Sequence, residues 1–271
     1  MSTLNKISTV YFSPSNTTKR IAEKIASNFE GTPEVHDLLM YKDDGEIREF
    51  GDYDIVIVGM PVFAGRIPKV AREKLEKFKG KGVPAIAFVN KGNADVGDSL
   101  LELTDILKDN GFNVIGAAQF ISQHSIFTKV AEGRPDEKDL EKIHDFAVKC
   151  KERIEDDVEG DVKVPGNKPY CDYQVVPFKA TCDESLCIFC YDCVPVCPQN
   201  AIPEDDPVST DASKCDGCTA CIYVCPEDAR SFAGEAFEQT EPVFVEKFSK
   251  REEPEFYFWF SNFFIIKFFL D

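Results

Sequence analysis

The chain has 271 residues, 43% of them hydrophobic, which is enough for two domains with at least one sizeable core. Its 48 acidic residues outnumber 31 basic ones, a formal net charge of -17 at pH 7. This balance disfavours contact with a phosphate backbone, so we expect no nucleic-acid partner, and it suits docking to basic faces of redox partner proteins. A solvated acidic surface is the simpler explanation of the same charge. No N-terminal stretch resembles a signal peptide, and we expect a cytoplasmic protein.

Predicted strands and helices alternate through the first two-thirds of the chain. Strands are predicted at residues 7–12, 34–40, 54–59, 84–90 and 112–120, and helices at 19–29, 69–78, 97–110 and 136–155. The third and fourth strands are continuously apolar, as parallel strands are when both faces are covered. Five β-α units in this order predict an α/β fold with a doubly wound parallel sheet of five strands.

Three loops of this pattern follow strands that end at one edge of the predicted sheet. Residues 13–18 read Ser-Pro-Ser-Asn-Thr-Thr and open a helix, and the other two loops span residues 60–66 and 90–95. Hydroxyls, backbone N–H groups and a helix N-terminus are what a phosphate requires, although the same residue types are also ordinary helix caps. Ligands of such sheets bind beyond the carboxyl ends of the strands, so the convergence of the loops favours a phosphate-bearing ligand.

The regular pattern ends near residue 156. Residues 157–180 contain acidic residues, then Pro165, Gly166 and Pro169, which is typical of an interdomain linker. Its few apolar residues, Val175, Val176 and Phe178, are expected to fix it to one of the two domains. The predicted organisation is a first domain at 1–156, the linker at 157–180, a small α+β domain at 181–235 and a C-terminal extension at 236–271.

The small domain contains two strings of four cysteines, each spaced C-x2-C-x2-C-x3-C-P. They are Cys187, Cys190, Cys193 and Cys197, then Cys215, Cys218, Cys221 and Cys225. Bacterial ferredoxins use this spacing for 4Fe-4S clusters, and the cysteine before the proline ligates the other cluster. We therefore assign one cluster to Cys187, Cys190, Cys193 and Cys225, and the other to Cys215, Cys218, Cys221 and Cys197.

Zinc and disulfides are the alternatives for these cysteines. A zinc site needs four ligands in two pairs and has no use for the third cysteine or the proline, and a disulfide scaffold suits a secreted protein. Cys150, Cys171 and Cys182 lie outside the strings and are expected to be buried or free thiols. Cys182 is also a spare ligand candidate, which we rank lower.

The two strings differ beside their second cysteine. The second string has Gly217 there, where the backbone closes on a cluster, whereas the first has Phe189 and Tyr191. Bulky neighbours can shield a cluster from water, and solvent exposure is one of the factors that set its potential. The sequence therefore predicts unequal potentials for the two clusters.

The C-terminal run of residues 256–270 is almost wholly apolar and contains the only tryptophan. It is shorter than the roughly 20 residues that a membrane-spanning helix needs. Three interpretations stay open: a segment packed on the protein, an interfacial membrane anchor, and an extension outside the common design of the fold. We rank packing or extension above membrane association.

Together these features resemble the flavodoxin-ferredoxin fusion family of anaerobic microbes, from about residue 5 to about 257. The opening strand, SPSNTT loop and helix look like the flavodoxin phosphate loop, although Ser15 stands where such loops commonly have Gly. The resemblance implies a flavodoxin-like sheet of order 2-1-3-4-5, an FMN and two 4Fe-4S clusters. The implied FMN phosphate residues are Ser13, Ser15, Asn16, Thr17 and Thr18, and those around the ring are Pro61, Val62, Phe63, Ala64, Gly65, Asn90, Gly92 and Asn93.

The function expected on this basis is that of an electron-transfer oxidoreductase, an iron-sulfur flavoprotein that passes electrons between the clusters and FMN. The alternative is a dicluster electron carrier whose flavodoxin-like domain docks partners without flavin. No catalytic residue is predicted, since electron passage needs no protein acid or base. His124 alone among the histidines lies near the expected ligand edge, and an ordinary loop histidine is the simpler explanation. The sequence predicts no particular oligomeric state.

Overall fold

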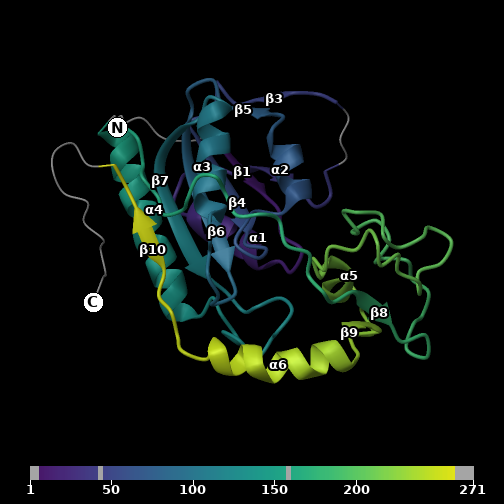
Figure 1. Cartoon of the computed structure of the whole chain (residues 1–271). Helices are drawn as coiled ribbons and strands as arrows, with labels where there is room; N and C mark the ends of the chain where they lie inside the picture. The colour runs from purple at the N-terminus through teal and green to yellow at the C-terminus, as the bar shows by residue number, and fades with distance from the viewer. Residues whose placement is uncertain (1–5, 42–44, 157–159, 260–271) are drawn as a thin grey trace.

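The computed structural model describes residues 6–41, 45–156 and 160–259. Its larger part is a six-stranded sheet with helices on both faces, and a small lobe of loops lies beside it (Figure 1). The sheet contains β1 (Ile7–Tyr11), β2 (Glu34–Asp37), β4 (Ile55–Pro61), β6 (Pro84–Lys91), β7 (Asn113–Ile121) and β10 (Glu255–Tyr257). The helices around it are α1 (Thr17–Ala26), α2 (Lys69–Leu75), α3 (Ser99–Asp109) and α4 (Glu137–Glu155).

The five strands from the first domain are parallel and adjacent in the order β2-β1-β4-β6-β7, the predicted 2-1-3-4-5 arrangement. This is the flavodoxin-like order, which places its ligand site at the switch point beside β1. The sheet has one strand more than predicted, because β10 pairs antiparallel with the edge strand β7. The extension predicted at 236–271 therefore contributes a strand to the first domain.

Alternate side chains of the central strands pack in two separate hydrophobic cores, one on each face of the sheet. Ile55 and Ile57 of β4 join α1 and α4 on one face, while Val56 and Val58 join α2 and α3 on the other. All four side chains are fully buried, and each contributes about 1.5–3 kcal/mol of hydrophobic stabilisation. Burial on both faces explains why this strand has no polar alternation.

The small lobe consists mostly of the two cysteine loops. Its regular elements are the antiparallel pair β8 (Ala180–Cys182) and β9 (Arg230–Phe232) and the short helix α5 (Ala220–Tyr223). From β9 the chain enters α6 (Glu235–Lys247), which runs back beneath the first domain to β10 (Figure 1). The lobe is thus joined to the first domain at both its ends.

Two local predictions differ from the structure. The helix predicted to reach residue 78 ends at Leu75, because Phe78 is fully buried against Phe50 in the short parallel pair β3 (Arg48–Glu49) and β5 (Phe78–Lys79). Helix α6 was not predicted: it contains Pro242, and its apolar residues Phe237 and Phe244 are only partly buried.

The apolar C-terminal run packs on the protein as far as residue 259. Phe256 and Phe258 contact the core beneath α4, and Tyr257 and Trp259 contact the core beneath α3. This alternation is that of a strand with both faces covered. The rest of the run, residues 260–271, lies outside the described residues. Within those residues, no helix combines the length and apolarity that crossing a membrane requires.

Candidate functional site

Two small cavities in the lobe are each surrounded by four cysteines drawn from both strings. One is lined by Cys187, Cys190, Cys193 and Cys225, and the other by Cys197, Cys215, Cys218 and Cys221. These are the two sets that the motif predicts, with the cysteine before each proline crossing to the other set. We call them the outer and the inner cysteine cage. Of the remaining thiols, Cys150 is buried, Cys171 is exposed, and Cys182 lines the outer cage.

The two cages differ sharply in exposure. In the outer cage, Cys190 and its neighbours Phe189 and Tyr191 are exposed. The equivalent residues of the inner cage, Cys218, Gly217 and Thr219, are buried. The first loop, which carries the bulky residues, faces solvent, and the glycine-containing loop faces the rest of the protein. Unequal potentials remain a prediction, now with the outer site as the wetter one.

Both loops nevertheless share one backbone conformation. Phe189 and Gly217 have φ values of 56° and 73°, and Tyr191 and Thr219 have 66° and 75°. Left-handed backbone is free of penalty for glycine and costs about 1–2 kcal/mol for a residue with a Cβ atom. The first loop therefore carries two aromatic side chains where the backbone does not favour them.

A buried arginine lies between the cages. Arg230 is 2% exposed; it lines the outer cage and donates hydrogen bonds to Thr210 Oγ1 (3.0 Å) and Ser209 O (3.2 Å), while its Nε has no partner in the described structure. Burial acts to lower its pKa, but the nearby thiols, led by Cys193 and followed by Cys221, outweigh burial and raise it. A buried cation needs negative charge beside it, and two clusters with cysteine thiolates supply that charge.

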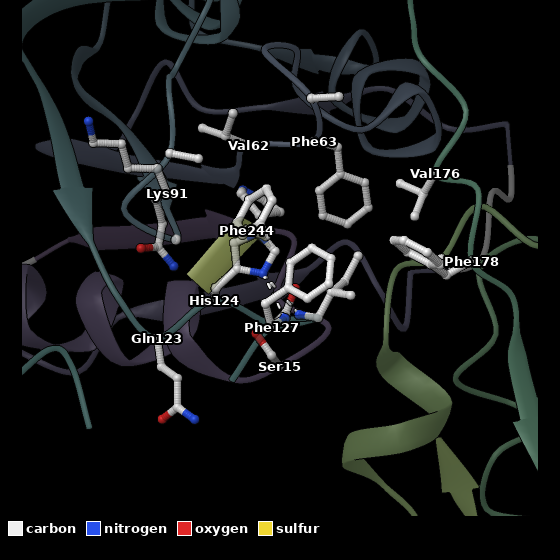
Figure 2. A pocket seen from close by; sticks show the side chains of 18 of the residues that line it. Ser15, Val62, Phe63, Lys91, Gln123, His124, Phe127, Val176, Phe178 and Phe244 are labelled. Carbon is white, nitrogen blue, oxygen red and sulfur yellow. Dashed lines mark hydrogen bonds between the residues drawn. The ribbon is translucent and has the colours of Figure 1, made fainter. Parts of the chain in front are cut away.

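A cavity of about 390 Å³ lies between the lobe and the carboxyl ends of β1, β4, β6 and β7 (Figure 2). We call it the interdomain cavity. Eight of the predicted flavin residues line it: Ser15, Thr17, Pro61, Val62, Phe63, Ala64, Asn90 and Gly92. It is also lined by residues of the loop after β7 (122–127), the linker (174–178), the inner cage (Gly217) and α6 (Thr240 and Phe244).

The hydroxyl end of the interdomain cavity is built on the N-terminus of α1. This helix has no acidic residue in its first turn and no side-chain hydrogen bond from its N-cap, Asn16. Such an end favours an anion through its dipole and the N–H groups that have no partner within the helix. The left-handed residue of the loop is Asn16 (φ 60°), so Ser15 needs no glycine conformation. Ser13 lies outside the cavity, where its hydroxyl accepts a hydrogen bond from Lys19 N (2.9 Å).

Asn90 connects this end to the end of β7. Its Nδ2 donates to Oγ1 of Thr17 (3.0 Å) and of Thr18 (3.3 Å), and its Oδ1 accepts from Ser122 Oγ (2.7 Å). These contacts orient the amide and hold the Thr17 hydroxyl at the cavity wall. Thr18 itself is buried behind that wall, and Gly65 lies beside Gly97, away from the cavity.

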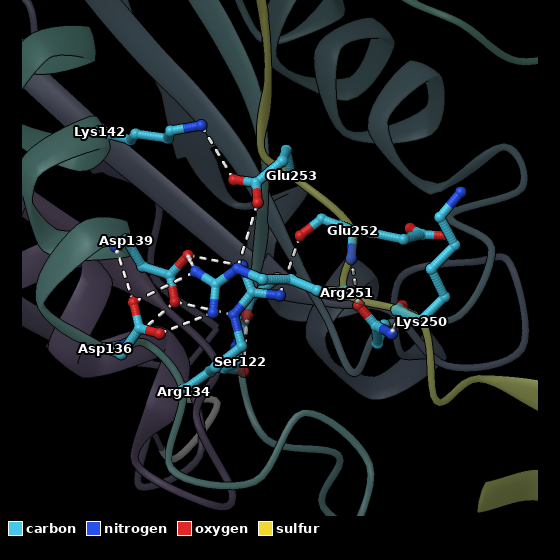
Figure 3. A network of polar contacts seen from close by, with 11 residues as sticks. Ser122, Arg134, Asp136, Asp139, Lys142, Lys250, Arg251, Glu252 and Glu253 are labelled. Atoms are coloured by element: carbon cyan, nitrogen blue, oxygen red, sulfur yellow. Dashed lines mark hydrogen bonds and ion pairs between the residues drawn. The ribbon is translucent and has the colours of Figure 1, made fainter. Parts of the chain in front are cut away.

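Asn93, predicted beside the ring, instead holds the C-terminal segment. Its Nδ2 donates to the carbonyls of Phe248 (2.8 Å) and Lys250 (2.7 Å), and its Oδ1 accepts from Glu252 N (3.2 Å). Figure 3 shows the network that continues this attachment, with Arg134 bound to Asp139 and Arg251 bound to Asp136. The network fixes the end of α6 against the loop after β6 and the start of α4.

The middle of the cavity is apolar. Phe63 lies opposite Val176 and Phe127 in Figure 2. Phe127 stacks on Phe244 of α6 at 4.3 Å between ring centroids and meets Phe178 of the linker edge-on at 5.8 Å. These rings form one cluster that joins the first domain, the linker and α6.

His124 packs closely on Gly92, where a Cβ atom would lie 2.6 Å from the ring Cδ2. Its Nδ1 accepts hydrogen bonds from the N–H groups of Ile126 and Phe127, each at 3.1 Å. Burial lowers the pKa of His124 to about 4. The ring is therefore neutral at pH 7, and because Nδ1 accepts, Nε2 carries the proton.

A buried ion pair of the first domain, Arg66–Glu102, binds the linker that forms one wall of the cavity. Arg66 donates two hydrogen bonds to Glu102, at 2.8 and 2.7 Å, and a third to the carbonyl of Cys171 at 2.5 Å. Its guanidinium lies over the rings of Tyr170 and Tyr173, at 4.9 and 4.1 Å from their centroids. The linker thus binds the first domain through residues 170–173, just before it lines the cavity.

Sequence reasoning placed His124 near the ligand edge and expected the linker to attach to one domain, but it did not predict that the loop at 122–127, the linker and Gly217 line the cavity. The loop could have been found by the rule that gave the other three loops, because it follows a parallel strand at the same edge. The linker and Gly217 come from outside the domain and carry no local signal.

Comparisons with known proteins give separate matches for the cysteine-containing lobe and for the larger α/β part of the chain. Residues 186–229 match the family model of the 4Fe-4S dicluster domain. A search of curated protein sequences finds no significant match. Among solved structures, the chain is similar to a flavodoxin from the domain Archaea (16% identity, 55% of this chain and 99% of that one, TM-score 0.38) and to Flavodoxin 1 from Bacillus cereus (19%, 55% and 98%, TM-score 0.41).

The family match and the sheet topology define the class of the protein. It is an iron-sulfur protein in which a dicluster ferredoxin domain with two 4Fe-4S clusters follows a flavodoxin-like domain. Such clusters transfer single electrons.

Proposed function

We propose that this protein transfers electrons between its two 4Fe-4S clusters and an FMN held in the interdomain cavity. The observation that carries the proposal is the position of Gly217. This residue stands between two thiols of the inner cage, Cys215 and Cys218, and lines the same cavity as Ser15 and Phe63 of the flavodoxin-like domain. A flavin in that cavity would border the inner cluster loop directly.

The residues around the cavity fit FMN in three respects. The α1 N-terminus with Ser15 and Thr17 suits a phosphate, and the apolar walls of Phe63 and Phe127 suit a planar ring. The Nε2–H of neutral His124 is a hydrogen-bond donor on the wall. When bound, FMN would supply chemistry in steps of one or two electrons.

The protein's own contribution is to position the walls of the cavity and to shield the inner cage from solvent. Arg66 and Glu102 hold the linker wall, and the network around Asn93 holds α6. Together these attachments place apolar side chains between the inner cage and solvent. No side chain is required to move a proton for an electron to pass.

Anaerobic purification followed by acid treatment tests the proposal. We expect release of about one FMN per chain, with iron near eight atoms per chain as two cubanes require. The variant Thr17→Val should bind FMN more weakly, because the Thr17 hydroxyl is at the wall of the interdomain cavity. It should keep its iron, because Thr17 lines neither cysteine cage. Full iron without flavin, and no quenching of FMN fluorescence by the purified chain, would favour the dicluster carrier without flavin.

A further inference from the structure

The outer cage presents a group of apolar side chains to solvent. Leu186, Ile188, Phe189 and Tyr191 are 49%, 59%, 48% and 40% exposed, and we call them the outer patch. Twelve large apolar side chains are exposed in the described part of the chain, and a third of them fall within these six consecutive positions. Scattered exposed apolar residues need no explanation, whereas a contiguous group marks an interaction site.

The backbone conformation of the outer patch indicates that its aromatic side chains do not serve the stability of the fold. Phe189 and Tyr191 both have left-handed φ values, and the equivalent of Phe189 in the inner loop is Gly217. Glycine would suit this conformation better, and the exposed phenyl ring fills no core. Side chains held in such unfavourable conformations are concentrated at functional sites.

The outer patch also adjoins the outer cage. Ile188 and Tyr191 line the cage itself, next to Cys190, which is exposed. The inner cage has no such opening, since Gly217, Cys218 and Thr219 are buried. A partner seated on the outer patch would therefore approach the outer cluster more closely than the inner one.

Charge indicates what kind of partner fits. Residues 181–235 contain eleven acidic residues and two basic ones, and one of those two, Arg230, is buried. Exposed carboxylates flank the patch in the sequence at Asp183, Glu184 and Asp192, and the exposed Glu227 lines the same cage as Ile188. The net charge of -17 opposes a second copy of this chain as the occupant.

We propose that the outer patch is the docking surface for a one-electron redox protein with an apolar centre and a basic rim. One electron passes between the partner's redox centre and the outer cluster, so that one of them is oxidised as the other is reduced. The route inward to FMN rests on the proposed function, but docking at the outer cluster does not need the flavin.

Stopped-flow mixing of the dithionite-reduced full chain with cytochrome c, a basic one-electron acceptor, tests the surface. The ferric haem is reduced to ferrous as the cluster is oxidised. We expect Phe189→Gly to lower the second-order rate constant roughly tenfold, as loss of a central aromatic contact does. Ile188→Ser is a second variant that leaves the backbone preference unchanged, and Ile47→Ala, at an exposed site of the first domain, is the control.

Three readouts accompany the rate. Iron content and electron transfer to methyl viologen, which needs no docking surface, should be unchanged in Phe189→Gly, and both cluster potentials are titrated so that rates are compared at equal driving force. The rate with cytochrome c should fall with rising salt, and Asp192→Asn with Glu227→Gln should weaken that dependence, whereas Asp145→Asn on α4 should not. Asp145 is exposed on the first domain.

The proposal is overturned if both outer-patch variants react with cytochrome c as fast as the Ile47→Ala control. It is also overturned if they change the oligomeric state and not the rate, since the patch would then join copies of this chain. If the chain as purified holds no FMN and binds none when FMN is added, yet still shows the outer-patch effect, the proposed function alone is contradicted.

Discussion

Gly217 packs against Val176 so closely that a Cβ atom on Gly217 would lie 3.0 Å from Cγ1 of Val176. The inner cysteine loop and the linker wall therefore meet at a point where a Cβ atom would require Val176 to shift by a few tenths of an ångström. Gly217 also has φ 73°, a left-handed backbone conformation that favours glycine independently of the contact with Val176. This contact brings the inner cage to the interdomain cavity.

Substitution of Gly217 by alanine should separate these two effects when it is compared with Gly133→Ala. Gly133 has nearly the same φ, 74°, with nothing within 4 Å of its added Cβ. Both variants should lose about 1 kcal/mol through left-handed alanine, and Gly217→Ala a further ~1–3 kcal/mol through crowding. Urea unfolding and FMN affinity are the measurements. Equal loss in the two variants would show that the lobe is free to move away from the linker.

Removing one partner of the Arg66–Glu102 pair should be costly. Glu102 is 1% exposed, so Glu102→Gln leaves a buried guanidinium without its counter-charge and should lower the free energy of unfolding by about 3–5 kcal/mol. The exposed pair Lys69–Glu73 is the control, and Glu73→Gln should cost no more than about 1 kcal/mol. Chemical denaturation measures both. A small effect at Glu102 would mean that water reaches this pair.

The neutral state of His124 predicts a pH-dependent stability. Its folded pKa of about 4 lies below the ordinary value of 6.5, so the unfolded chain binds the proton more readily. The contribution is complete above pH 6.5 and is lost as pH falls toward 4, by on the order of 3 kcal/mol. Anaerobic denaturation of His124→Gln at several pH values should show a shallower slope in this window than the parent chain. Parallel slopes would contradict the buried neutral imidazole.

Arg230 should raise the potentials of both clusters. Replacing it by methionine removes a buried positive charge near both cages, and each cluster should become harder to reduce, by on the order of 100 mV for a charge several ångströms away at an effective dielectric constant of about 20. Lys214→Met, which removes an exposed charge beside Cys215, should shift the potentials far less because solvent screens it. Redox titration followed by electron paramagnetic resonance measures both variants. Equal shifts would place Arg230 in a solvated site.

The sequence was sufficient where local chemistry determines structure. The cysteine spacing gave both cages, including the crossing of Cys197 and Cys225, and the alternating apolar runs gave five parallel strands, whose order agrees with the one that the resemblance implies. The hydroxyl loop before α1 was predicted for the same reason. Each of these features is encoded within a few consecutive residues.

What the sequence did not predict depends on contacts between distant segments. Asn93 holds residues 248–252, more than 150 positions away, so its neighbours in the sequence do not show its use. The aromatic residues Phe127, Phe178 and Phe244 form one wall only because the linker and α6 both return to the sheet. The exposure of Phe189 likewise follows from which cysteine loop faces the first domain.

Anaerobic reduction of the reconstituted full chain tests the central claim most directly. With limiting dithionite, the flavin absorption bands and the broad cluster absorption should bleach together on a single rapid time course in the parent chain. In Cys215→Ser, which removes a ligand of the inner cage, flavin bleaching should become much slower while the outer cluster still reduces. Flavin reduction at the same rate in both chains would contradict the account, because electrons would then reach the flavin without the inner cluster.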